Sequence, residues 1–88
     1  MKIAVQLLTW NGEAFLSDCL FSLANQSFKD WQIFVLDNHS TDSTVAIVNN
    51  WLNASHGSAK ILPQNVGFAR GHNILAKSHN APYVFILN

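Results

Sequence analysis

The chain has 88 residues, which is enough for one small domain and too few for two. Its formal net charge is zero and 11% of its residues are charged, so it lacks the basic stripe that holds nucleic acid and the polybasic patch that holds anionic lipid. Nucleic acid is therefore not an expected partner. The hydrophobic fraction of 49% is high for so short a chain, as expected when strands are buried on both faces or when part of the fold is missing.

The single cysteine excludes an internal disulfide and a cysteine-rich zinc site, and it fits a reducing compartment. Cys19 stands among apolar residues, so we expect it to pack in the core. The apolar run at residues 3–8 is too short for a signal peptide, and no apolar stretch approaches the roughly 20 residues that span a bilayer. The sequence predicts a cytoplasmic protein with no membrane contact in this segment.

Apolar runs and amphipathic stretches alternate along the first half of the chain. The first predicted strand spans residues 3–8, and Asn11 is placed to cap the helix that follows it. The second predicted strand spans residues 33–36, and residues 40–42 supply cap-type side chains for a helix that ends near Asn53. The apolar faces of these helices comprise Phe15, Leu16, Cys19, Leu20, Leu23 and Ala24 in the first and Val45, Val48, Trp51 and Leu52 in the second.

The second half continues the alternation after a polar, turn-rich connection at residues 53–58. A third strand is predicted at residues 60–62, a helix at residues 67–78 and a fourth strand at residues 83–87, each strand being apolar enough to be buried. The third helix has a weaker apolar stripe, formed by Phe68, Ala69, His72, Leu75 and Ala76. The order β-α-β-α-β-α-β predicts an α/β fold: an open parallel sheet with right-handed crossovers and helices on both faces.

Ligands of such sheets bind at the carboxyl ends of the strands, so the polar residues there are site candidates. Thr9 and Asn11 follow the first strand, with Trp10 between them, and Asp37 and Asn38 follow the second. A carboxylate at residue 37 can accept hydrogen bonds from the N–H of a base or from a ribose hydroxyl. Helix capping is the structural alternative for Asn11, and it is compatible with ligand contact.

The loop at residues 65–73 contains two glycines and one arginine close to a predicted helix start, a composition that could serve a diphosphate. Its structural alternative is a helix-start glycine at Gly67 and a solvated side chain at Arg70. The loop matches neither the dinucleotide-binding nor the P-loop motif. The four histidines show no metal-ligand spacing with each other or with Cys19.

In five segments the chain resembles the family 2 glycosyltransferases, in particular the rhamnosyltransferase-like members that act on bacterial surface polysaccharides. The order and spacing of the five segments together carry the resemblance, which covers essentially the whole chain. The segments are the first strand running into Thr9-Trp10-Asn11; Cys19-Leu20-Phe21-Ser22-Leu23 through Gln26; Val35-Leu36-Asp37-Asn38-His39-Ser40-Thr41-Asp42-Ser43-Thr44; Asn65-Val66-Gly67-Phe68-Ala69-Arg70-Gly71-His72-Asn73; and Val84-Phe85-Ile86-Leu87-Asn88.

This resemblance implies the amino-terminal half of a GT-A fold, in which the first half holds a nucleotide diphosphate sugar and the second half binds the acceptor. Thr9 and Asp37 match positions that contact the nucleoside, with Asp37 toward the base, and Trp10 stands where Tyr or Phe is more usual. Asn88 matches the first position of a motif for Mg²⁺ or Mn²⁺, usually Asp-x-Asp and often Asn-Pro-Asp in the rhamnosyltransferase-like branch. The implied nucleotide-sugar-binding residues are Thr9, Trp10, Asn11, Asp37, Asn38, Asn65, Gly67, Arg70 and Asn73.

The implied reaction is an inverting single displacement that transfers a hexose, rhamnose among the candidates, from a dTDP- or UDP-linked donor. The acceptor would be a glycan or a lipid-linked saccharide in polysaccharide or cell-envelope glycan synthesis. The full-length protein would act at the inner face of the membrane. We do not expect the catalytic base to lie within residues 1–88. The resemblance therefore implies that residues 1–88 form a partial glycosyltransferase domain, truncated at the metal motif and inactive by itself.

Two alternatives remain. A non-catalytic, truncated nucleotide-binding half-domain would keep the donor site without transfer. A receiver-type signalling domain has the same alternation of elements, but it needs an acidic pair after the first strand, where this chain has Leu7-Leu8-Thr9.

Overall fold

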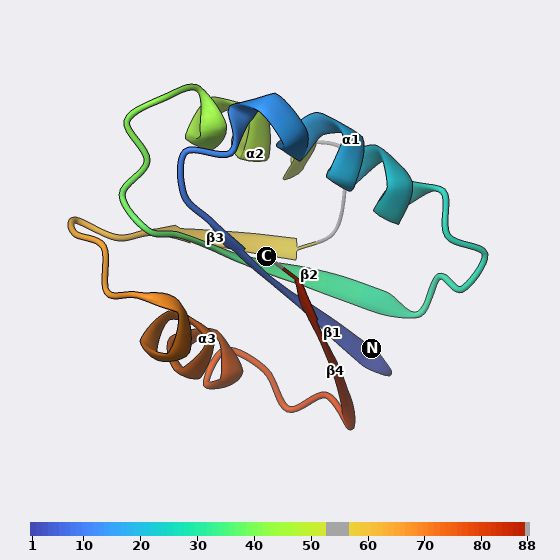
Figure 1. Ribbon diagram of the computed structural model, residues 1–88. Coiled ribbons are helices and arrows are strands. Elements are labelled where there is room, and N and C mark those ends of the chain that lie inside the picture. Colours follow the sequence, from blue (N-terminus) through green and yellow to red (C-terminus); the bar gives the residue numbers. More distant parts are fainter. Residues whose placement is uncertain (53–56, 88) are drawn as a thin grey trace.

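The computed structural model describes residues 1–52 and 57–87, and in them it contains a four-stranded parallel sheet with the order β3-β2-β1-β4. The inner strands are β1 (Ile3–Thr9) and β2 (Trp31–Asp37), and the outer strands are β3 (Gly57–Ile61) and β4 (Tyr83–Leu87). Figure 1 shows this order and the helices that connect the strands. The predicted α/β fold with an open parallel sheet is confirmed.

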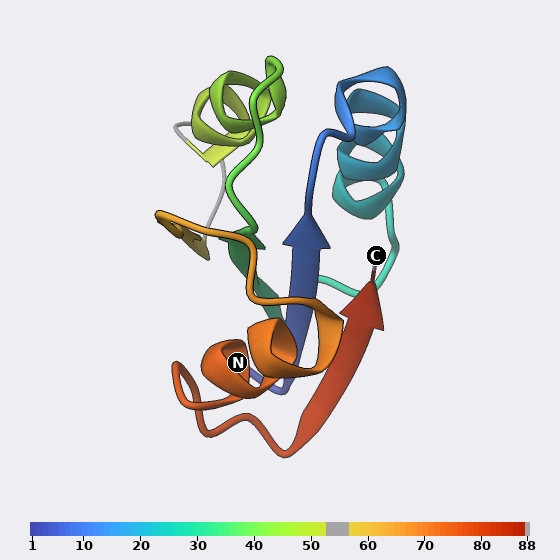
Figure 2. The same ribbon diagram turned by 60° about the vertical axis from the view of Figure 1, so that its left-hand side comes forward.

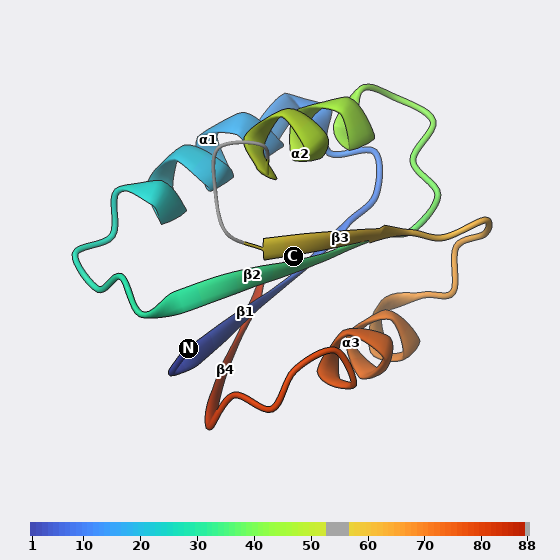
Figure 3. The same ribbon diagram turned by 180° about the vertical axis from the view of Figure 1, so that it is seen from behind.

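The helices lie on both faces of the sheet, as Figures 1 and 3 show from opposite sides. Helices α1 (Glu13–Ala24) and α2 (Thr44–Leu52) cover one face, and α3 (Phe68–Ala76) covers the other. In Figure 2 the arrows of β1 and β4 point in the same direction. The loops that follow the parallel strands therefore gather at one edge of the sheet.

Each face of the sheet has its own apolar core. The core beneath α1 and α2 is the larger, because two helices cover the sheet there, and it is formed by Val5, Leu7, Leu16, Leu20, Leu23, Trp31, Ile33, Val35 and Val48. The core beneath α3 is formed by Ala4, Phe34, Leu36 and Leu75. Burial of an aliphatic or aromatic side chain of this size stabilises a fold by about 1.5–3 kcal/mol.

The prediction that all four strands are buried is correct for β1 and β2 and wrong for β3 and β4. The four residues from Tyr83 to Ile86 are 47–61% exposed. Strand β4 is exposed because α3 packs on β1 and β2, and because β4 is the last strand of the sheet and pairs with a neighbour on one side only. Strand β3 also begins earlier than predicted, at Gly57, because its pairing with β2 starts opposite Ile33. Residues 53–56 of the predicted connection lie outside the described residues.

Several predicted helix details need correction. Phe15 was expected on the buried face of α1 but is 78% exposed, because the buried stripe follows Leu16, Leu20 and Leu23, one residue further along the helix. Cys19 is half-buried at the side of that stripe, and this partial burial raises the pKa of its thiol.

Helix α3 ends at Ala76 rather than residue 78, and Phe68, Ala69 and Ala76 of its predicted stripe are exposed. The predicted end of α2 near Asn53 falls outside the described residues. None of the helices in residues 1–52 and 57–87 combines the length and the hydropathy that a membrane span needs.

Candidate functional site

A buried carboxylate stands where the two inner strands end. Asp37 and Thr9 are the last residues of β2 and β1 and lie opposite each other in the sheet. Thr9 Oγ1 donates to Asp37 Oδ1 at 2.7 Å, and Ser40 donates its backbone N–H to Oδ2 at 2.8 Å and its hydroxyl to Oδ1 at 2.6 Å. Asp37 is 2% exposed. Three donors therefore tie both strand ends and the β2–α2 loop to one carboxylate.

The β1–α1 and β2–α2 loops are joined through Asn11. Its Oδ1 accepts a hydrogen bond from the backbone N–H of Thr41 at 2.8 Å, and its own N–H donates to Ser40 Oγ at 2.9 Å. The prediction that Asn11 caps α1 is wrong, because the residue before α1 is Gly12, without a side-chain cap of its own, and the Asn11 amide is turned toward the other loop. Asn11 (φ 47°) and His39 (φ 69°) have left-handed backbones, a conformation to which Asn and His are among the better suited non-glycine residues.

The amino ends of α1 and α2 cap each other. Gly12 N–H donates to Thr44 Oγ1 at 2.9 Å and Glu13 N–H to Asp42 Oδ2 at 3.3 Å, while Ser43 N–H donates to Glu13 Oε2 at 2.9 Å. In addition, Thr44 N–H donates to Asp42 Oδ1 at 2.9 Å. The hydrogen bond from the Thr44 side chain is the main reason that the pKa of Asp42 lies below its ordinary value, with backbone N–H groups adding to the effect. Sequence patterns predict a cap within one helix and do not reveal this exchange.

Asn38 connects the end of β2 to the β3–α3 loop. Its Oδ1 accepts from Val66 N–H at 3.0 Å, and its Nδ2 donates to the carbonyl oxygen of Gly67 at 3.2 Å. Within the loop, Asn65 Oδ1 accepts from Gly67 N–H at 2.8 Å. Gly67 has φ 85°, so the turn into α3 requires a residue without a Cβ atom.

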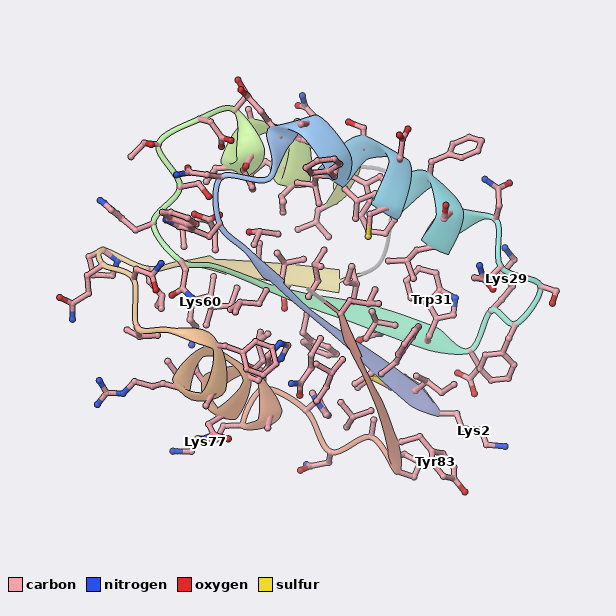
Figure 4. The ribbon with its side chains drawn as sticks, viewed as in Figure 1. Lys2, Lys29, Trp31, Lys60, Lys77 and Tyr83 are labelled. Atoms are coloured by element: carbon pink, nitrogen blue, oxygen red, sulfur yellow. The ribbon has the colours of Figure 1, made fainter. Side chains whose placement is uncertain are left out.

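The remaining predicted site residues are exposed around these loops: Trp10, Asn65, Arg70 and Asn73. Arg70 makes no ion pair with any described residue. Lys2, Lys29 and Tyr83 lie at the opposite end of the sheet from Lys60, as Figure 4 shows. A hollow of about 410 Å³ beside the end of β1 is lined by Trp10 and Phe15, among others.

Asn88, the predicted metal position, lies outside the described residues. In residues 1–52 and 57–87, no group of three or more His, Cys, Asp or Glu side chains could hold a metal ion.

One buried polar cluster escaped the sequence analysis. Gln6 Nε2 donates to His72 Nδ1 at 3.2 Å and to the His72 carbonyl oxygen at 3.3 Å, and His79 Nε2 lies 2.9 Å from Gln6 Oε1. His79 Nδ1 accepts from Ala81 N–H at 3.2 Å, which leaves the proton on Nε2. The cluster holds α3 and the chain after it against β1. The available signal was a glutamine in the middle of an apolar strand.

Comparison with known families gives one match over nearly the whole chain. The sequence profile described as Glycosyl transferase family 2 matches residues 5–88. Among characterised relatives, poly(ribitol-phosphate) beta-N-acetylglucosaminyltransferase TarS of Staphylococcus aureus is 30% identical over all of this chain and 16% of that protein. The poly(ribitol-phosphate) beta-glucosyltransferase of Bacillus spizizenii is 40% identical over 58% of this chain and 8% of that protein. The chain thus spans a small part of each relative.

Solved structures agree with this result. The crystal structure of residues 1–349 of S. aureus TarS superposes with a TM-score of 0.91 at 30% identity, over 99% of this chain and 27% of that one. The same TarS segment has been solved with UDP-GlcNAc and with UDP. The mannosyltransferase PcManGT from Pyrobaculum calidifontis, solved with GDP-Man and Mn²⁺, shares the fold with a TM-score of 0.83 at 19% identity, over 90% of this chain and 24% of that one.

Proposed function

The chain belongs to the family 2 glycosyltransferases, and from this premise we propose that the loops at the carboxyl ends of its strands bind the nucleoside diphosphate sugar of a sugar-transfer reaction. We name these loops (residues 9–12, 37–41 and 64–71) the crevice. The observation that carries the proposal is the set of hydrogen bonds on Asp37, which fixes the ends of β1 and β2 before any ligand arrives. The proposed donor site comprises Thr9, Trp10, Asn11, Asp37, Asn38, Asn65, Gly67, Arg70 and Asn73.

The nucleoside lies against Thr9, Trp10 and Asp37 in this proposal. An ionised carboxylate offers about four acceptor positions, and Thr9 and Ser40 occupy three of those on Asp37. One position therefore remains for the N–H of a base, although the carboxylate is buried and a ligand would have to reach it from the loop side. Trp10 is 57% exposed and offers a ring face for stacking.

The diphosphate lies near residues 65–73 in this proposal. Arg70 is exposed and makes no ion pair with a described residue, so its guanidinium is available for a phosphate oxygen. The first turn of α3 begins at Gly67 without a side-chain cap, and its backbone N–H groups add partial positive charge there.

The donor is a hexose linked to UDP or dTDP, rhamnose among the sugars. The acceptor is a glycan or lipid-linked saccharide of the cell envelope, which the names of the poly(ribitol-phosphate) transferases favour. The acceptor hydroxyl would attack the anomeric carbon while the nucleoside diphosphate leaves from the opposite side, which inverts the configuration. The whole enzyme would work in the cytoplasm at the inner face of the membrane. No residue of this chain is assigned as the base.

A divalent cation, Mg²⁺ or Mn²⁺, belongs to the proposal for the whole enzyme, and the Mn²⁺ of PcManGT favours it. The described residues of the crevice do not fit a cation, because their one aspartate carboxylate, Asp37, is already bonded to Thr9 and Ser40. Asn88, the predicted metal position, lies outside the described residues. None of the steps above depends on the cation.

A second candidate is a nucleotide-binding half-domain without transfer activity. The observation that favours it is that the described chain supplies residues for binding the donor, while the one carboxylate of the crevice, Asp37, is held in structural hydrogen bonds. Both candidates predict nucleotide binding, and they differ in whether a sugar is transferred to an acceptor.

Calorimetric titration with UDP tests the shared part of the two candidates. Arg70→Ala should weaken UDP binding at least about tenfold, because a charge-assisted hydrogen bond contributes about 1.5–3 kcal/mol. Lys77→Ala is the matched control, since it removes the same charge from the other end of α3. Equal affinities for wild type and Arg70→Ala would remove Arg70 from the site, and no binding of either UDP or dTDP by wild type would overturn the proposal.

A further inference from the structure

The Asn38 amide is 2% exposed, and both of its ends are bonded to the backbone of the β3–α3 loop. We propose that Asn38 is a positioning residue that holds this loop in the shape that binds the donor, and that it acts on the donor through the loop and not by direct contact. The inference rests on the proposed function for its ligand. Its structural part, the hold of Asn38 on the loop, can be tested without any ligand.

Asn38 is itself fixed to the sheet. Its backbone N–H donates to the carbonyl oxygen of Thr9 at 2.8 Å, and the preceding residue ends β2. The loop is thereby linked through one side chain to the ends of both inner strands. A loop held in this way is ordered before the donor arrives, so binding does not have to order it.

The Asn38 amide also fixes the start of α3. The carbonyl oxygen of Gly67 accepts from Asn38 Nδ2 and from the backbone N–H of Gly71 at 3.2 Å, which closes the first turn of the helix. A Cβ atom on Gly71 would lie 2.6 Å from Leu8 Cδ1 and 3.7 Å from Asn38 Nδ2. The missing side chain at residue 71 therefore leaves room for the Leu8 side chain where α3 packs against the sheet. The position of Arg70, one residue earlier, follows from the same contacts.

The chemistry of the loop requires an amide at residue 38. The loop presents one donor, Val66 N–H, and one acceptor, the Gly67 carbonyl, to the same side chain. Asparagine supplies one acceptor and one donor at this reach. Aspartate would keep the acceptor for Val66 but place a second oxygen against the Gly67 carbonyl, and alanine would leave both groups without their partner.

Amide hydrogen exchange, followed by NMR without ligand, tests the hold of Asn38 on the loop. In wild type, Val66 N–H should be protected although it lies in a loop; an unprotected Val66 would overturn the proposal. Asn38→Ala should speed Val66 exchange at least about tenfold, as expected for loss of a hydrogen bond. Asn38→Asp should retain protection at Val66, because the acceptor oxygen remains.

The controls separate a local effect from unfolding. Leu62 N–H, which donates to the Asp37 carbonyl at 3.0 Å, should exchange at the wild-type rate in all variants. Asn49→Asp makes the same chemical change on an exposed position of α2 and should leave Val66 unchanged. If Asn38→Ala unfolds, Leu62 will lose protection too. In that case the protection of Val66 in wild type and in Asn38→Asp decides whether Asn38 holds the loop.

Titration with UDP tests the action through the loop. Asn38→Asp and Asn38→Ala should each weaken UDP binding about tenfold, and Arg70→Ala should weaken it much less in the Asn38→Ala background than in wild type. Independent, multiplicative effects of the two substitutions would contradict a shared action through the loop. Wild-type protein that binds neither UDP nor dTDP would overturn the proposed function. The exchange rate at Val66 would still test the hold of Asn38 on the loop, because that measurement uses no ligand.

Discussion

The crevice and the outer strand β4 differ in how far other residues of this chain bond or cover their side chains. At the crevice, Asp37, Asn38 and Thr9 are buried polar residues whose side chains are all bonded to protein partners. Strand β4 is apolar, yet the four residues from Tyr83 to Ile86 are exposed. An apolar hollow of about 430 Å³ lies between β4 and α1. The side chains of the crevice are therefore held by hydrogen bonds within this chain, whereas the apolar side chains of β4 are left exposed.

Asp37→Ala should have the largest effect, because it breaks the crevice. Removal of a buried carboxylate leaves the hydroxyls of Thr9 and Ser40 and one N–H without their acceptor, which should lower the free energy of unfolding by about 3 kcal/mol. Urea denaturation measures the loss. Asp18→Ala is the control, since Asp18 is exposed on α1. A loss no larger than that of the control would mean that the carboxylate does not organise the crevice.

Asn11→Ala should have the next largest effect. It removes the acceptor of the Thr41 N–H and places alanine at φ 47°, so the unfolding free energy should fall by about 2 kcal/mol. Asn11→Gly loses the same hydrogen bond but tolerates the backbone angle, and it should recover about 1 kcal/mol of that loss. Equal stability of the two variants in thermal melts would exclude backbone strain at residue 11.

The Asp42 cap should produce a smaller effect that depends on pH. The folded state lowers the pKa of Asp42, so its contribution to stability is complete above the ordinary value of 3.8 and is lost as pH falls through the lower folded value. Asp42→Asn should therefore be less stable than wild type at pH 7, and the two melting temperatures should converge below pH 4. A constant difference across that range would show that the charge is not what caps α1 and α2.

Ile86→Lys should have the smallest effect on stability, within about 0.5 kcal/mol, because Ile86 is exposed on β4. We expect the purified chain to self-associate through this apolar edge strand, and a charge there should oppose the pairing. Sedimentation velocity should show more monomer for the variant at equal concentration. Unchanged association, or a wild-type chain that is monomeric throughout, would mean that β4 is not the associating surface.

The sequence predicted the order of elements well, because apolar runs and helical spacing are local properties. It could not show which strands are covered: β1 and β4 are similarly apolar, and their burial depends on where α1 and α3 pack. The apolar content of Tyr83 to Ile86 therefore predicted a strand correctly and its burial wrongly.

For the candidate site, the sequence placed Thr9 and Asp37 correctly at neighbouring strand ends, since parallel strands align their carboxyl ends. It misassigned Asn11 because a cap residue looks the same whether it serves its own helix or a loop some 30 residues away. The two hydrogen bonds from Ser40 to Asp37 were not predicted, because contacts across loops leave no periodic signal.

The most direct test of the central claim is a titration of the ¹⁵N-labelled protein with UDP, followed by the amide NMR signals. We predict that the signals of residues 9–12, 37–41 and 64–71 shift with one common binding curve, while those of β4 (Tyr83–Leu87) stay in place. Shifts concentrated on β4 and α1, or no shift at millimolar UDP, would contradict the assignment of nucleotide binding to the crevice.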